Sequence, residues 1–270
     1  MTGGLGNEGR PVSRDDAVAE DGIEDSIGDR MSSNLAEIEW KGRTGPFWLS
    51  LGPGVFSPTS TSRTLADALE ITPGDTVIDV GCGSGVLAFV AAKLGAAKIY
   101  GVDLSHRAVE AARDNAKRLG LEHRCEFREG DLLEPVKDVR ATVLIGDVSG
   151  IPDQIAAESG WFDDVPAGGP TGAELPTKFL RSIGDTLAPG GRLYLPTGTI
   201  QDEPAILAAA REVFGDHMEP VLEREFPLPD LVARSKAVAA MMKDGLLNLR
   251  QRGSRLLWRL QIWRCDRVDG

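Results

Sequence analysis

A cluster of glycines and a set of acidic residues follow successive apolar segments, where they can bind one ligand together. The first segment, Val77–Val80, contains Asp79 and is followed by Gly81, Gly83 and Gly85. Glycine within regular structure costs roughly 0.5–1 kcal/mol relative to alanine, so three glycines in five residues indicate a sharp turn or a close approach to a ligand. The stretch VLAFVAAK that follows has the pattern of a helix. The glycines therefore join a strand to a helix, where α/β sheets hold ligands.

Two further acids end the next predicted strands. Asp103 closes the strand in KIYGVDLS, and Asp131 follows the third strand, in EGDLLE, beside Leu132. A carboxylate at the first position can accept both hydroxyls of a ribose, and one at the second can accept from an adenine amino group while leucine packs the ring. The spacing departs from the dinucleotide fingerprint, which needs glycine where this chain has Val86, and the GK[ST] ending of a P-loop is absent. One adenosine-containing ligand accounts for the glycines and both acids.

Polar residues also follow the fourth predicted strand, in ATVLIGDVSGIPD. Asp147 can accept a hydrogen bond from an amine and take the proton that an ammonium must lose before its lone pair attacks. Ser149 can position an oxygen or nitrogen nucleophile. The alternative is that Asp147 caps the following helix and contacts no substrate.

The order of elements predicts an α/β fold with a doubly wound, mostly parallel sheet. Beyond residue 201 we expect a helical insertion before an antiparallel edge strand, because that strand alternates between apolar and polar residues. The predicted strands are 76–80, 98–102, 124–128, 141–146, 191–196, 218–226 and 255–265, and the predicted helices are 63–69, 85–95, 105–119, 151–158, 173–187, 203–214 and 230–248.

Composition limits the domain organisation and the location of the protein. The 270 residues are 41% hydrophobic, with no run of about 18 apolar residues and no secretory signal pattern, so we expect a cytoplasmic protein. Residues 1–35 are acidic and lack aromatic residues, which predicts a disordered tail, and residues 36–270 are predicted to form the domain. Within that domain we distinguish a leading segment and helix at 36–70, a ligand-binding core at 71–200, and a C-terminal part at 201–270 with a helical insertion at about 230–248.

Charge and metal-ligating residues argue against two classes of partner. The formal charge is −11, of which residues 1–30 contribute −5, so the remaining chain is acidic too and a nucleic-acid substrate is disfavoured. The three cysteines and three histidines are scattered without metal-ligand spacing, and we expect no metal.

The stretch VIDVGCGSGVLAFVAAKLGAAKIYGVDLS resembles the first two motifs of class I S-adenosylmethionine-dependent methyltransferases, and the likeness covers roughly residues 55–200. The resemblance implies a Rossmann-like sheet of seven strands with an antiparallel last strand, and S-adenosyl-L-methionine as the cofactor. It also implies that Asp79 helps to hold the methionine amino group, Asp103 the ribose and Asp131 the adenine. The implied cofactor-binding residues are Asp79, Gly81, Cys82, Gly83, Gly85, Asp103, Leu104, Asp131, Leu132 and Asp147.

Within this superfamily the chain most resembles the release-factor glutamine N5-methyltransferases and related ribosomal-protein methyltransferases, through FSPTSTSR, Ile151-Pro152 and GGPTGAE. That branch carries Asn-Pro-Pro-Tyr where this chain has Asp147-Val148-Ser149-Gly150, so the acceptor motif is degenerate. Protein arginine methyltransferases have a sequence similar to AAKLGAAKIYGVDLS. They rely on paired glutamates, and no such pair follows the fourth predicted strand of this chain.

We therefore expect direct methyl transfer to a nucleophile, with Asp147 and Ser149 as catalytic residues and nitrogen as the favoured acceptor atom. The missing aromatic and the extra helical segment favour a small metabolite, whereas the family likeness favours a protein side chain. Oxygen methylation of a hydroxyl or carboxylate, or an inactive cofactor-binding scaffold, stay open as alternatives. Six residues are expected either to line the acceptor site or only to pack the core: Phe47, Trp48, Phe56, Trp161, Phe162 and Met242.

Overall fold

The computed structural model describes residues 36–159 and 166–268 of the 270-residue chain. These residues all belong to the unit that spans Met31–Gly270. The predicted acidic tail, residues 1–35, lies outside the described residues, and so do the predicted substrate residues Trp161 and Phe162.

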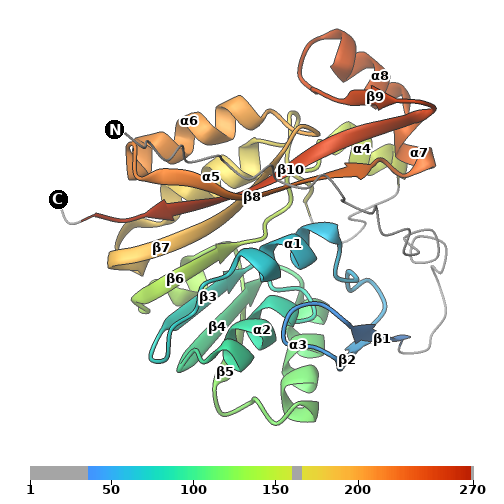
Figure 1. The fold of residues 1–270 in the computed structure, drawn as a ribbon. Helices are drawn as coiled ribbons and strands as arrows, with labels where there is room; N and C mark the ends of the chain where they lie inside the picture. The colour runs from blue at the N-terminus through green and yellow to red at the C-terminus, as the bar shows by residue number, and fades with distance from the viewer. Residues whose placement is uncertain (1–35, 160–165, 269–270) are drawn as a thin grey trace, which may run out of the picture. The chain divides into compact units, whose positions relative to one another are not determined.

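A central sheet with helices on both of its faces forms the core of the fold (Figure 1). Its strand order within the described residues is β5-β4-β3-β6-β7-β10-β8, and β9 pairs with β10 as an eighth strand. Neighbours from β5 to β7 are parallel, whereas β10 is antiparallel to β7, β8 and β9. The strands are β3 (Thr76–Val80), β4 (Lys98–Asp103), β5 (Cys125–Glu129), β6 (Ala141–Gly146), β7 (Leu187–Gly198), β8 (Met218–Pro227), β9 (Arg250–Arg252) and β10 (Arg255–Asp266).

The predicted α/β class, with a mostly parallel sheet and an antiparallel last strand, is confirmed, and two details differ. The sheet has β9 in addition to the seven expected strands, and β10 lies between β7 and β8 rather than at the edge. The prediction of an edge strand was wrong because side-chain alternation reports how the two faces of a strand are covered. Whether a strand has one or two neighbours depends on its backbone hydrogen bonds, which the side-chain pattern does not report.

Helices cover both faces of the sheet because alternate residues of the parallel strands are apolar on each side. Val77 belongs to the core cluster under α1, α2 and α3, and its neighbour Ile78 belongs to the cluster under α5 and α6. The helices are α1 (Ser60–Ala68), α2 (Val86–Leu94), α3 (His106–Arg118), α4 (Asp153–Ser159), α5 (Glu174–Ser182), α6 (Glu203–Phe214), α7 (Asp230–Ala233) and α8 (Lys236–Lys243), with 3-10 turns η1 (Glu134–Val136) and η2 (Gly184–Thr186).

The helical insertion differs from the single helix predicted over 230–248. It consists of the short α7 and α8, and Ser235 stands between them with its hydroxyl accepting from the Val238 backbone N–H at 3.0 Å. A serine that caps a new helix offers the backbone an alternative to continuing the old one. The apolar period continues through the break, which is why the pattern suggests one helix.

A short hairpin precedes the sheet, in the predicted leading segment. Strands β1 (Ala36–Trp40) and β2 (Phe47–Leu51) pair antiparallel. The buried Asn115 side chain of α3 accepts from the Ser50 backbone N–H at 2.8 Å and donates to the Ser50 carbonyl at 3.0 Å. It also donates to the Ser84 carbonyl at 3.1 Å, so one amide attaches the hairpin to the glycine loop.

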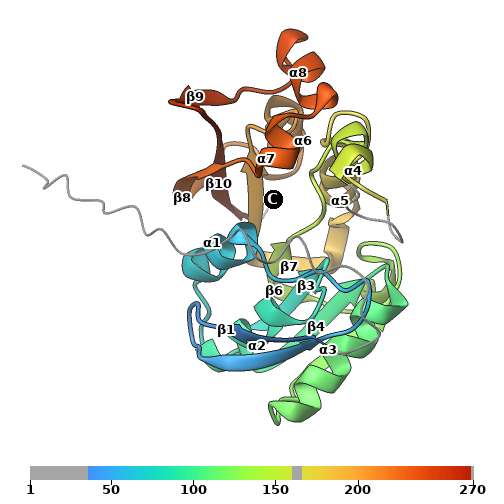
Figure 2. The same cartoon turned by 90° about the vertical axis from the view of Figure 1, so that its right-hand side faces the viewer.

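The insertion packs beside the loop that follows β6, as Figure 2 shows for α7, α8 and α4. Val232 of α7 and Val238 of α8 share a buried cluster with Ile155 of α4, and Ile151 of the loop packs against that cluster. Among the described residues, no helix combines the length and apolar content needed to cross a bilayer.

Candidate active site

The glycine loop connects β3 to α2 and approaches the end of β6. Gly81 has φ of 78°, and a Cβ atom there would overlap the backbone carbonyl of Asp147. Gly83 has φ of 52° with no heavy atom within 4 Å of an added Cβ, so it borders open space. Gly85 begins α2 as its N-cap, where the ring of Phe89 passes close by. The predicted turn is confirmed, and Gly83 leaves room for a ligand to approach the backbone.

Replacing Gly81 by alanine should destabilise the fold and distort the acceptor loop. The left-handed backbone alone costs roughly 1–2 kcal/mol for a residue with a Cβ atom, and the overlap with Asp147 adds to this. Gly120→Ala is the matched control, because Gly120 has a similar φ of 67° but open space around it. Denaturant unfolding should show a larger loss for Gly81→Ala; equal losses would mean that the close approach is unimportant.

Asp79 is a fully buried carboxyl with one oxygen unused. Its Oδ2 accepts from the Ala88 backbone N–H at 3.0 Å, whereas its buried Oδ1 has no hydrogen-bond partner. Burial, together with the negative charge of Asp147, raises the pKa of Asp79 to about 8. Such a carboxyl fits a cationic ligand group, which would supply both the missing donor and the compensating charge.

The raised pKa of Asp79 predicts that the ligand-free protein loses stability as pH rises from about 4 to about 8. An unfolded aspartate ionises near pH 4. Between the two pKa values the folded state therefore holds a proton that the unfolded chain has released, so the stabilisation is complete below about pH 4 and lost above about pH 8. Thermal unfolding at pH 5 and pH 8 should show a smaller difference for Asp79→Asn than for the wild type. An unchanged difference would assign the slope to other groups.

Asp103 organises the glycine loop from the end of β4. Its Oδ2 accepts from the Gly83 backbone N–H and its Oδ1 from the Ser105 backbone N–H, both at 2.9 Å. Burial raises its pKa, and backbone donors at Ser105, Gly83 and Leu104 oppose that rise. Each oxygen retains acceptor capacity, so Asp103 can hold the loop and accept ligand hydroxyls together. The neighbouring Leu104 is exposed.

The third predicted acid has a partner that the sequence does not reveal. Asp131 forms an ion pair with Lys178 of α5, with 2.6 Å between Nζ and Oδ2. Leu132 beside it is buried with φ of 51°. Cys82, in the glycine loop, is buried as well, and burial raises the pKa of its thiol.

Asp147 follows β6 and faces α1. Its Oδ2 accepts a hydrogen bond from the Ser62 hydroxyl at 3.2 Å. Burial of the carboxyl raises its pKa to about 6, and the Ser62 bond opposes that rise. The alternative role as a helix cap is not supported, because α4 begins six residues later, at Asp153. The sequence does not single out Ser62, because its polar surroundings in FSPTSTSR predict only a helix start.

In the loop after Asp147, the position of the aromatic that the resembled branch carries is taken by another side chain. A Cβ atom at Gly150 would overlap the side-chain amide of Gln201. Oriented to satisfy both groups, that amide donates to the Gly150 carbonyl at 2.9 Å and accepts from the Gly198 backbone N–H at 3.2 Å. The Ser149 hydroxyl accepts from the Ile151 backbone N–H at 3.4 Å, a long bond that leaves it free to turn.

The expected substrate residues divide between surface and core. Trp48 and Phe56 are 52% and 43% exposed. Phe47 is buried between Trp40 and Phe89 with ring centroids 6.2 and 6.4 Å away, so its placement supports the core alternative. Met242 packs against the cluster that holds the insertion to α4, which also supports core packing.

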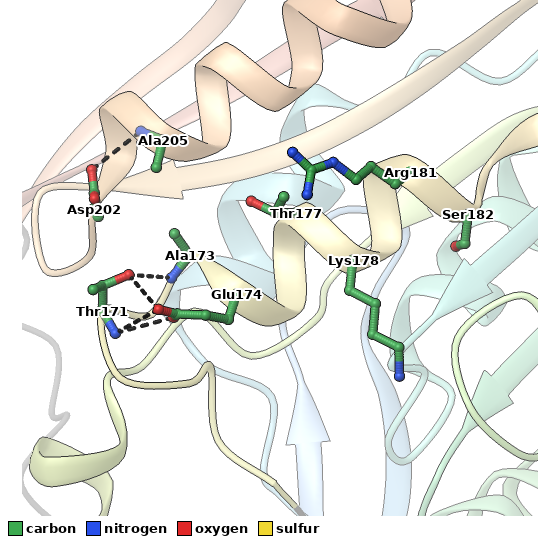
Figure 3. A pocket seen from close by; sticks show the side chains of 9 residues that line it. All are labelled: Thr171, Ala173, Glu174, Thr177, Lys178, Arg181, Ser182, Asp202 and Ala205. Carbon is green, nitrogen blue, oxygen red and sulfur yellow. Dashed lines mark hydrogen bonds between the residues drawn. The ribbon is translucent and has the colours of Figure 1, made fainter.

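A groove of about 630 Å³ lies elsewhere, along α5 and the start of α6 (Figure 3). Its lining includes Glu174 and Asp202 as well as Lys178 and Arg181, so both charges are present. Asp79, Asp103 and Asp147 are not part of its wall, and we do not assign it to the reaction. Within the described ranges no three His, Cys, Asp or Glu side chains gather in a way that could hold a metal ion.

Comparisons with known proteins show a sequence likeness over the same segment. The family described as "Ribosomal protein L11 methyltransferase (PrmA)" matches residues 49–158, which include the glycine loop, the three acids and Asp147. Ribosomal protein L11 methyltransferases of Escherichia coli O1:K1 and Shigella boydii serotype 18 are each 50% identical over 79 residues. That match covers 29% of this chain and only 27% of each relative.

Solved structures show the same fold over more of the chain. The match with the ribosomal protein L11 methylase of Lactobacillus delbrueckii subsp. bulgaricus covers 81% of this chain and 84% of the methylase, at 20% identity and a TM-score of 0.51. The match with the M. jannaschii tRNA m1G37 methyltransferase covers 86% of this chain and 55% of that enzyme, at 16% identity and a TM-score of 0.54. Over residues 49–158 the chain is therefore similar in sequence to ribosomal protein L11 methyltransferases, and its fold is that of the class I S-adenosylmethionine-dependent methyltransferases.

Proposed function

We propose that this protein transfers a methyl group from S-adenosyl-L-methionine to an amine nitrogen on a protein side chain. The observation that carries the proposal is the Asp147 carboxyl. It lies after β6, comes close to the glycine loop through its backbone, and is held by Ser62. The matched family and curated relatives, named for methylation of a ribosomal protein, support a protein acceptor.

The residues at the strand ends fit the cofactor. The unpaired Oδ1 of Asp79 suits the amino group of the methionine part, and Gly83 leaves open space for it. Asp103 has acceptor capacity for the ribose hydroxyls. Asp131 suits the adenine amino group only if its carboxylate binds the amino group and Lys178 together, or if the ion pair with Lys178 opens. When bound, the cofactor supplies a methyl group on a positively charged sulfur.

Asp147 is the residue that prepares the acceptor. A protonated amine has no free lone pair, so its proton must leave before the nitrogen can attack the methyl carbon. The Asp147 carboxylate can accept that proton and hold the nitrogen in place. A pKa of about 6 leaves the carboxylate ionised near neutral pH while making it a stronger base than an exposed aspartate. Positioning the nitrogen in line supplies much of the remaining rate increase.

The exposed Trp48 and Phe56 suit a protein acceptor that arrives from solvent. Apolar side chains at a surface are common anchors for a partner chain. A cytoplasmic location belongs to the same proposal, since that is where ribosomal proteins are made and folded. The net charge of −11 stays a prediction against a nucleic-acid substrate. Because a tRNA methyltransferase is among the structural neighbours, the test must include nucleic acid.

Methyl-labelled cofactor incubated with the protein and a cell extract tests the proposal. We expect label in the protein fraction, recovered after acid hydrolysis as an N-methylated amino acid. Label in nucleic acid or in small molecules would contradict the acceptor, and a base-labile methyl group would indicate a carboxylate instead. No label in any fraction above that of extract incubated without the protein would contradict catalysis and favour the scaffold.

A further inference from the structure

We infer that Ser62 is a positioning residue, which fixes the Asp147 carboxylate so that its other oxygen meets the acceptor nitrogen. The inference rests on the proposed function and adds a residue from α1 to the reaction. Ser62 is buried, and its hydroxyl donates to Asp147 Oδ2 across 85 positions of sequence.

The hydroxyl of Ser62 is itself held in place. It accepts from the Thr59 backbone N–H at 3.3 Å, in the capping box that begins α1. The donor and acceptor of the hydroxyl are thus both used, which sets the direction of its hydrogen. A fixed hydroxyl removes the rotational freedom of the Asp147 carboxyl, which otherwise lies on a loop outside regular structure.

This arrangement leaves one carboxylate oxygen for the substrate. Among the described residues Ser62 supplies the side-chain hydrogen bond to Asp147, and it reaches Oδ2. Oδ1 then remains to receive the amine proton. Phe56 lies in the segment just before α1. An acceptor that contacts this segment would therefore bind close to the helix whose Ser62 orients Asp147.

The loss of the Ser62 hydrogen bond determines the direction of the expected pH effect, and the charged groups near Asp147 stay in place. Asp79 of β3 is coupled to Asp147 through like charge, and Asp103 of β4 is coupled to Asp79. Arg63, the neighbour of Ser62 on α1, is exposed. The Ser62 bond lowers the pKa of Asp147 against the effect of burial. Its removal should therefore raise that pKa.

Ser62→Ala is the test, with Ser62→Thr as the variant that keeps a hydroxyl and Thr59→Ala as the matched control. Thr59→Ala weakens the cap of α1 without removing the donor to Asp147. For Ser62→Ala we expect the acid limb of kcat/KM to move upward by as much as about one pH unit. We also expect kcat to fall with little change in the KM for the cofactor. Ser62→Thr should restore both, and Thr59→Ala should leave the limb in place.

A second measurement does not depend on methyl transfer. Carboxyl-carbon NMR of aspartate-labelled, cofactor-free protein should show one resonance, absent in Asp147→Asn, that titrates at higher pH in Ser62→Ala. The same shift in Thr59→Ala, or no shift in folded Ser62→Ala, would overturn the inference. If no acceptor is methylated while the NMR shift appears, the proposed function fails and the hydrogen-bond role stands.

Discussion

Asp147→Asn should bind the cofactor as tightly as the wild type does while losing roughly 10²–10⁴-fold in kcat, the range typical of a general base. Asparagine keeps the shape of the side chain and an oxygen that can accept from the Ser62 hydroxyl. It cannot take a proton from an ammonium group. Single-turnover methylation, together with calorimetric binding of the cofactor, separates the loss of turnover from any loss of affinity.

A neighbouring aspartate provides the control for this variant. Asp153 opens α4 on the same loop, and its Oδ1 accepts from the Gly169 backbone N–H at 3.1 Å, a bond that asparagine can also accept. Asp153→Asn should therefore retain activity. Asp147→Asn with full turnover would show that the acceptor nitrogen loses its proton to solvent, and it would remove the central support for an amine substrate.

The second large effect is expected at Asp103, whose removal should weaken cofactor binding by about 100-fold or more. Hydrogen bonds to a charged group are each worth about 1.5–3 kcal/mol, and a ribose presents two hydroxyls. Alanine at this position also releases the Gly83 backbone N–H, which Asp103 holds at 2.9 Å. Isothermal calorimetry with S-adenosyl-L-methionine and its demethylated form measures the loss directly.

Two variants separate the role of Asp103 in binding from its role in the loop. Asp103→Asn keeps an acceptor for Gly83 but has no negative charge, so it should show part of the loss. Asp114→Ala, on the exposed surface of α3, should bind normally. Unaltered affinity in a folded Asp103→Ala protein would contradict the placement of the ribose, and with it the assignment of the strand ends to one adenosyl ligand.

The sequence predicts those parts of the fold whose signals are local. The parallel strands appear as apolar runs because both faces of each strand are buried, as Val77 and Ile78 show. The glycine loop is visible because an amino acid without a Cβ atom is required where Gly81 meets Asp147. Asp79 and Asp103 could be placed at one end of the sheet because parallel strands align their carboxyl ends.

Contacts between distant segments could not be predicted in this way. The Ser62 bond to Asp147 and the Lys178 bond to Asp131 join residues 85 and 47 positions apart. The position of β10 inside the sheet depends on backbone pairing with β7 and β8, to which its side-chain pattern is insensitive. At Gly150 the sequence shows that an aromatic is missing, but only the packing of Gln201 shows that the space is filled.

By itself, then, the sequence determined the α/β class, the glycine loop between a strand and a helix, and the acids at the strand ends, because each depends on neighbouring residues and on the period of a strand or helix. Only the tertiary structure decided how Asp147 is oriented, which oxygen of Asp79 is unpaired and which aromatic residues reach the surface. Those properties depend on desolvation and on hydrogen bonds between elements that meet only after the chain has folded.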